Sequence, residues 1–137
     1  MHTMTATRPA VTHRYRVALP SGPAAPAQAR GQVRAAILSW DVPVDPGTAV
    51  LLTSEVVTNA IRHAPGDTVL LAISCRRGQL RVDVHDTSRS LPVPVNAPAD
   101  AEAGRGLLLV NSLSDEWGTY RTPSGKSVYF ALDFRPS

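Results

Sequence analysis

The sequence predicts an α+β fold, a two-layer sandwich in which a mixed, mostly antiparallel sheet is covered on one face by about three helices. Its 137 residues are close to the usual size of one domain. Hydrophobic residues make up 43% and charged residues 18%, which is enough apolar material for a core. Four strand-like segments form two consecutive hairpins, and helix-like segments lie elsewhere. We expect a flexible tail over residues 1–12 and a single domain over residues 13–137.

The first half of the domain contains one strand followed by two helices. Residues 13–19 alternate between apolar and polar side chains, as a half-buried strand does. In residues 27–40 the apolar positions recur every three or four residues, which predicts an amphipathic helix. A second helix is expected over residues 48–64, with Thr48 as its N-cap and a proline-glycine pair as its stop.

The second half contains two predicted hairpins. Residues 68–75 and 80–86 are β-rich and are joined by a short turn that contains glycine. Residues 116–122 and 126–134 form the second pair, joined by a proline-serine-glycine turn. Because consecutive strands joined by short turns pair antiparallel, both hairpins favour an antiparallel sheet.

Between these hairpins lie a loop and a short helix. Residues 87–103 contain three prolines and are expected to be a loop. Residues 106–113 are a compact apolar run and are expected to form a short helix that glycine opens. The predicted order is therefore β-α-α-β-β-α-β-β.

Composition excludes several classes of protein. The chain has no apolar run of signal-peptide length and none near the roughly 20 residues that a membrane span needs, so a cytoplasmic protein with no membrane partner is expected. The single cysteine, Cys75, cannot form an internal disulfide. Fourteen basic and 11 acidic side chains give a net charge of only +3, and the basic residues are scattered. This distribution disfavours a nucleic-acid partner, which stays a third and weaker alternative.

The second predicted helix carries the most informative pattern. Steps of four residues place Glu55, Asn59 and His63 within an arc of about 80°. The rest of the helix is largely apolar, which predicts burial. An asparagine oxygen suits Mg²⁺, and a glutamate one turn away can accept a proton from an attacking hydroxyl or water. The alternative is an ordinary solvent-exposed face, on which these residue types are common.

Two further segments carry polar chemistry. Asp86 ends a predicted strand, where its carboxylate could accept a hydrogen bond from an exocyclic amine or could cap a turn. Gly104, Arg105 and Gly106 come immediately before the short predicted helix. Exposed N–H groups at a helix N-terminus can hold phosphate oxygens, although a single glycine pair is also typical of turns.

The order of these segments resembles the GHKL superfamily of ATP-binding domains. The helix with Glu55, Asn59 and His63 resembles its first box, Asp86 heads the second, and the segment from Gly104 to Leu107 resembles the third. The family's last box is resembled by the segment Gly125-Lys126-Ser127-Val128 of this chain. The likeness covers residues 13–134, nearly the whole chain. Because these residues include no histidine-bearing dimerisation helix, the chain most resembles stand-alone anti-sigma regulatory factors with serine/threonine kinase activity.

The resemblance implies a Bergerat-type fold that binds ATP and Mg²⁺. It implies that Asn59 ligates the metal, that Glu55 is the catalytic base, and that Asp86 recognises the adenine amine. Residues 87–103 would be the lid. Further nucleotide contacts are implied for Arg62, His63, Ser88, Gly104, Arg105, Gly106, Leu107 and Ser127, the last as a hydroxyl near adenine.

One departure from the family pattern concerns the proposed lid. Ser88 and Ser90 stand where the family has two glycines after the aspartate. Serine adopts positive φ less readily than glycine, so the loop is expected to be reshaped or stiffer.

Two functions follow from the resemblance. In the first, the protein phosphorylates a serine or threonine of a small anti-sigma antagonist and controls transcription by switching between that antagonist and a sigma factor. In the second, it is a non-catalytic module whose nucleotide fixes an interaction surface. Either function allows a homodimer.

Overall fold

The computed structural model describes residues 9–63, 67–87 and 101–136, and for residues 101–106 it describes the backbone alone. Eight elements follow one another in the predicted order. They are β1 Val11–Pro20, α1 Ala25–Ser39, α2 Pro46–His63, β2 Thr68–Arg76, β3 Gln79–Asp86, α3 Ala101–Leu113, β4 Glu116–Thr122 and β5 Gly125–Asp133. The predicted α+β class is confirmed.

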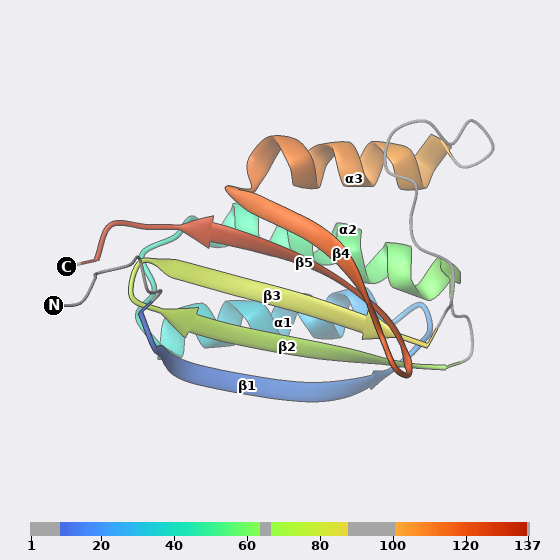
Figure 1. The fold of residues 1–137 in the computed structure, drawn as a ribbon, viewed down its shortest axis with the longest axis horizontal. Coiled ribbons are helices and arrows are strands. Elements are labelled where there is room, and N and C mark those ends of the chain that lie inside the picture. The colour runs from blue at the N-terminus through green and yellow to red at the C-terminus, as the bar shows by residue number, and fades with distance from the viewer. Residues whose placement is uncertain (1–8, 64–66, 88–100, 137) are drawn as a thin grey trace, which may run out of the picture.

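The strands form one five-stranded sheet in the order β1-β2-β3-β5-β4. Every adjacent pair of described strands is antiparallel, so the expected mixed sheet is antiparallel throughout this part of the chain. The second hairpin joins the first through β5, which lies beside β3. In Figure 1 helices α1 and α2 lie behind one face of this sheet, and α3 runs alongside α2. The helices thus form the second layer of the predicted sandwich.

Strand alternation separates the two faces of the sheet. Along β3 the side chains of Leu80, Val82 and Val84 are fully buried, whereas the intervening Arg81 and Asp83 are half-buried on the other face. The buried set meets apolar residues of α1 and α2 in one hydrophobic core. The core is therefore the layer between the sheet and the helices, because each strand contributes every second side chain to it.

Helix α2 begins earlier than the sequence suggested. It starts at Pro46, and Asp45 takes the N-cap role that was expected of Thr48. The Asp45 carboxylate accepts hydrogen bonds from the backbone N–H of Thr48 at 3.1 Å and from its hydroxyl at 2.7 Å. The hydrogen bond from the Thr48 hydroxyl, and after it the bond from the Thr48 backbone N–H, hold the pKa of Asp45 below its ordinary value of 3.8. The cap is therefore charged at neutral pH, next to the positive end of the helix.

Helix α3 also differs from its prediction. It begins at Ala101 rather than at residue 106, so residues 101–103 of the expected loop are helical. Alanine and glutamate there are strong helix formers, and a glycine within a helix costs only about 1 kcal/mol. The remaining part of the expected lid, residues 88–100, lies outside the described residues. In the described ranges no helix has both the length and the apolar character of a bilayer span.

Candidate functional site

Four element ends meet at one end of the molecule. Figure 1 shows the C-terminal half of α2, the end of β3, the beginning of β5 and the beginning of α3 at the same end of the sandwich. Helix α2 also packs directly against α3, β3 and β5. Segments that are far apart in sequence therefore bring polar residues of three predicted motifs to one region.

Asn59 is one of two buried polar residues of α2; the other, Thr53, donates its hydroxyl to the backbone oxygen of Ala49. The side chain of Asn59 is only 3% exposed. Neither its amide oxygen nor its amide nitrogen has a hydrogen-bond partner among the residues that the structure describes. Leaving a buried polar group unsatisfied costs about 1–3 kcal/mol. A ligand or a water would complete the bonding of this amide, and its oxygen is of the kind that Mg²⁺ accepts.

The other predicted residues of α2 differ in exposure. Glu55 and His63, one turn before and one turn after Asn59, are half-buried, whereas Arg62 is exposed. Ser54, on another side of the helix, accepts a hydrogen bond from Arg30 of α1 at 3.0 Å. Helix α1 therefore contacts α2 at Ser54, which lies about 100° around the helix from Glu55.

The end of β3 carries a buried ion pair. Lys126 Nζ donates to Asp86 Oδ2 at 2.8 Å, and the side chains of these residues are 0% and 1% exposed. They are opposite each other in the register of β3 and β5 and are the two fully buried charged residues of the described chain. The sequence placed Lys126 in the final predicted box but assigned it no role, because its proximity to Asp86 follows from a strand register that the sequence does not reveal.

Gly125 allows this close approach. A Cβ atom built on it would lie 2.0 Å from the backbone oxygen of Asp86 and 2.7 Å from the Cα of Thr87. Any other residue would push the beginning of β5 away from the end of β3. The glycine of the final predicted box therefore has a packing role that places Lys126 beside Asp86.

Ser127 does not lie with Asp86. It pairs with His85 in the strand register, and both line a hollow of about 360 Å³ on the sheet face that the helices leave open. Because side chains alternate along a strand, Lys126 rather than Ser127 faces the helices. Ser127 and Asp86 therefore lie on opposite faces of the sheet, and a contact between the Ser127 hydroxyl and adenine stays a prediction.

The third predicted box is helical. Arg105 and Gly106 are the fifth and sixth residues of α3, and Gly104 precedes them within the same helix. Arg105 and Gly106 lie far enough into the helix to donate their N–H groups to carbonyls four residues earlier, whereas the N–H of Gly104 is still within the first turn. Phosphate binding by these three residues stays a prediction. Leu107 is 2% exposed and is part of the buried interior. Ser88 lies outside the described residues.

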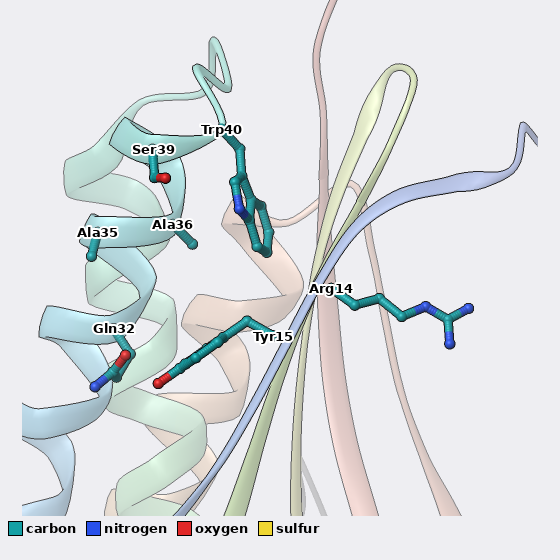
Figure 2. A pocket seen from close by; sticks show the side chains of 7 residues that line it. All are labelled: Arg14, Tyr15, Gln32, Ala35, Ala36, Ser39 and Trp40. Atoms are coloured by element: carbon teal, nitrogen blue, oxygen red, sulfur yellow. The ribbon is translucent and has the colours of Figure 1, made fainter.

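A separate hollow lies at the edge of the sheet that β1 forms. It measures about 250 Å³ and lies between β1 and α1. Figure 2 shows Tyr15 and Trp40 reaching toward it, whereas the end of the Arg14 side chain points away. None of the predicted site residues lines this hollow. In the described part of the chain, no three His, Cys, Asp or Glu side chains gather as a metal cluster would require.

Comparison with known proteins gives three findings. The histidine kinase-like ATPase domain family matches residues 19–132. Blue-light-activated histidine kinase 2 of Erythrobacter litoralis is 38% identical over 96 residues, which are 64% of this chain and 28% of that protein. The solved histidine kinase domain of a blue-light-activated kinase of E. litoralis aligns with a TM-score of 0.50 at 30% identity, covering 76% of this chain and 58% of that chain.

A longer structure from the same organism agrees with these findings. The E. litoralis blue-light-activated histidine kinase aligns with a TM-score of 0.51 at 29% identity, over 84% of this chain and 42% of that chain. This chain therefore spans about a quarter to somewhat over half of the relatives that it matches.

Proposed function

Since this chain belongs to the histidine kinase-like ATPase domain family, we propose that it binds ATP with Mg²⁺ and phosphorylates a serine or threonine of a small anti-sigma antagonist protein. By switching partners between that antagonist and a sigma factor, it would control transcription in the cytoplasm. The observation that carries this proposal is the buried amide of Asn59, which has no described partner and lies one helical turn from Glu55.

The described residues fit a magnesium ion bound together with nucleotide. Mg²⁺ commonly keeps several waters and takes its remaining ligands from one or two protein oxygens and the phosphates of the substrate. Asn59 would supply the protein oxygen through its amide. The bound ion would neutralise developing charge on the phosphates. His63 and Arg62, at the end of the same helix, carry donors that could contact phosphate oxygens.

Glu55 would act on the protein substrate. Its carboxylate would accept the proton of the attacking serine or threonine hydroxyl while that oxygen forms a bond to the γ-phosphorus and ADP leaves. The half-buried position of Glu55 suits this role, because the group is shielded yet reachable. Asp86 would recognise the base, at the end of β3 in the same region.

The choice of acceptor rests on the resemblance to anti-sigma factor kinases. The similar proteins are histidine kinases, so histidine is the competing acceptor. Acid treatment separates the two, because a phosphate ester of serine or threonine withstands acid and a phosphorylated histidine does not. Acid-stable label on the antagonist would support the proposal.

Glu55→Gln is expected to keep nucleotide binding and to reduce phosphoryl transfer at least about 100-fold, because general-base catalysis contributes about 10²–10⁴-fold. The protein would be incubated with γ-labelled ATP and candidate antagonist, and binding would be followed by calorimetry. Asp41→Asn is the matched control, since it removes a surface carboxylate at a φ of 55° that asparagine tolerates. Transfer at the wild-type rate in Glu55→Gln would remove Glu55 from the mechanism. Nucleotide binding without transfer in the wild type would favour the non-catalytic module.

Asn59→Leu is expected to raise the unfolding free energy of the ligand-free protein by about 1 kcal/mol or more, because an apolar side chain replaces an unsatisfied buried amide. The same variant should lose the stabilisation by Mg-ATP, which amounts to about 2.7 kcal/mol at ligand a hundredfold above its Kd. Urea unfolding with and without Mg-ATP measures both. Asn111→Leu is the control on α3, where the exposed amide accepts a bond from Trp117. Asn59→Leu with an undiminished Mg-ATP response would refute the metal assignment.

A further inference from the structure

The ion pair at the end of β3 alters the chemistry of the base-binding carboxylate. Asp86 does not face the helices as an isolated anion, because Lys126 Nζ lies 2.8 Å from its Oδ2 atom. The two side chains are 1% and 0% exposed, so bulk water does not screen either charge. A ligand that reaches Asp86 therefore meets a carboxylate and an ammonium together.

The backbone holds this pair in a defined place. Asp86 and Lys126 are register partners at the last position of β3 and near the first position of β5. Gly125 lies so close to the Asp86 backbone that a Cβ atom would approach its oxygen to 2.0 Å. The beginning of β5 thus cannot move toward β3 any further. Lys126 is a fixed component of the region.

Stability alone does not explain a buried ion pair. Removing two charges from water costs several kcal/mol for each ion, and well-packed apolar residues in their place are often equally or more stabilising. The next positions of β3 and β5 on the same face of the sheet, Val84 and Val128, are apolar. Two apolar residues would continue that pattern, so the presence of a carboxylate and an ammonium calls for a role in recognition.

We propose that Lys126 determines the base specificity of the nucleotide site and admits 6-oxopurine triphosphates alongside ATP. The inference rests on the proposed function, in which Asp86 meets the base. A carboxylate alone only accepts hydrogen bonds, so it favours the 6-amino group of adenine and repels the 6-oxo group of hypoxanthine or guanine. An ammonium only donates. The pair therefore offers an acceptor and a donor side by side.

Both purine types match such a pair. With adenine, the 6-amino group donates to Asp86 and ring nitrogen N1 accepts from Lys126. With a 6-oxopurine, the protonated N1 donates to Asp86 and the 6-oxo group accepts from Lys126. The ion pair need not break in either case, since a carboxylate has about four acceptor positions and an ammonium three donors. The donor and the acceptor exchange places between position 6 and N1 in the two purines, so a 6-oxopurine must lie shifted relative to adenine to meet the same pair. The rotating donors of the ammonium can follow either placement.

The test compares ATP with ITP, because inosine differs from adenosine in replacing the 6-amino group by a 6-oxo group with a protonated N1. Calorimetry with Mg²⁺ measures the ratio of the two Kd values. We expect the wild-type Kd for ITP to lie within about tenfold of that for ATP. In Lys126→Gln, which keeps a donor for Asp86 but removes the positive charge, the ratio should rise at least about tenfold, since sites left with mismatched polar groups discriminate strongly.

Two further variants separate specificity from folding. Lys126→Thr removes the charge with a smaller side chain and should raise the ratio in the same way. Arg121→Gln removes a positive charge from the exposed cross-strand neighbour of Lys126 and should leave the ratio unchanged. A purely structural role of Lys126 would weaken both nucleotides equally. The ratio is therefore the informative measurement.

The outcomes distinguish a failure of this inference from a failure of the proposed function on which it rests. Wild-type protein that binds ATP but rejects ITP more than a hundredfold would overturn the inference and leave ATP binding intact. An unchanged ratio in both Lys126→Gln and Lys126→Thr would do the same. Wild-type protein that binds neither nucleotide would overturn the proposed function and the inference together.

Discussion

Gly125→Ala is expected to lower the free energy of unfolding by about 3 kcal/mol or more, at the upper end of what overpacking costs. The added Cβ would lie 2.0 Å from the Asp86 oxygen and 2.9 Å from its carbonyl carbon. These are backbone atoms, so no side chain can rotate away to make room. The strands β3 and β5 would have to separate at this end, and the Asp86–Lys126 pair would separate with them. Urea denaturation measures the loss.

Gly31→Ala provides the matched control. Gly31 lies within α1, is exposed, and has nothing within 4 Å of an added Cβ. The same chemical change should there stabilise the protein by about 0.5–1 kcal/mol, because alanine favours a helix over glycine. If Gly125→Ala were as stable as the wild type, the close approach of the two strands would not exist in solution.

Asp86→Ala is expected to destabilise the ligand-free protein by about 3–5 kcal/mol, because it leaves the ammonium of Lys126 buried without its counter-charge. The distance of 2.8 Å and the near-complete burial of both groups place this pair among those whose disruption is costly. Thermal and urea unfolding in the absence of nucleotide measure the effect.

A double variant tests whether the charge itself is responsible. Asp86→Leu/Lys126→Met removes both charges and should recover most of the stability that Asp86→Ala loses, since an apolar pair of similar volume is often as stable as a buried ion pair. Recovery of stability without recovery of Mg-ATP binding would assign Asp86 to recognition rather than to folding. If the double variant were as unstable as Asp86→Ala, lost packing rather than lost charge pairing would explain the single variant.

The order of elements was predictable because local patterns determine it. Period-two alternation in β1 and apolar spacing of three and four residues in α1 identified these elements within a few residues. β-rich runs did so for β2 and β3, and a proline-glycine stop did so for the end of α2. Their ends were less predictable. At α2 the sequence predicted Thr48 as the cap, but Asp45, three residues earlier, caps the helix because its carboxylate accepts from the Thr48 amide. At α3 good helix formers extended the helix into the predicted loop.

The candidate site was predictable in its α2 part. Four-residue spacing predicted that Glu55 and Asn59 share one flank, and the apolar remainder of the helix predicted the burial that Asn59 shows. The catalytic role of Glu55 and the metal role of Asn59 stay predictions. Neither the exposure of Arg62 nor the ion pair of Asp86 could be inferred in the same way, because both depend on which elements pack nearby.

The sequence by itself determined the fold class, the element order and the flank of α2 that carries Glu55 and Asn59, since each depends on residues close together in the chain. Only the tertiary structure decided that Lys126 faces Asp86 while Ser127 lies on the open face. The physical reason is strand register. A shift of one residue between β3 and β5 would exchange the two side chains across the sheet, and the close contact at Gly125 determines which register forms.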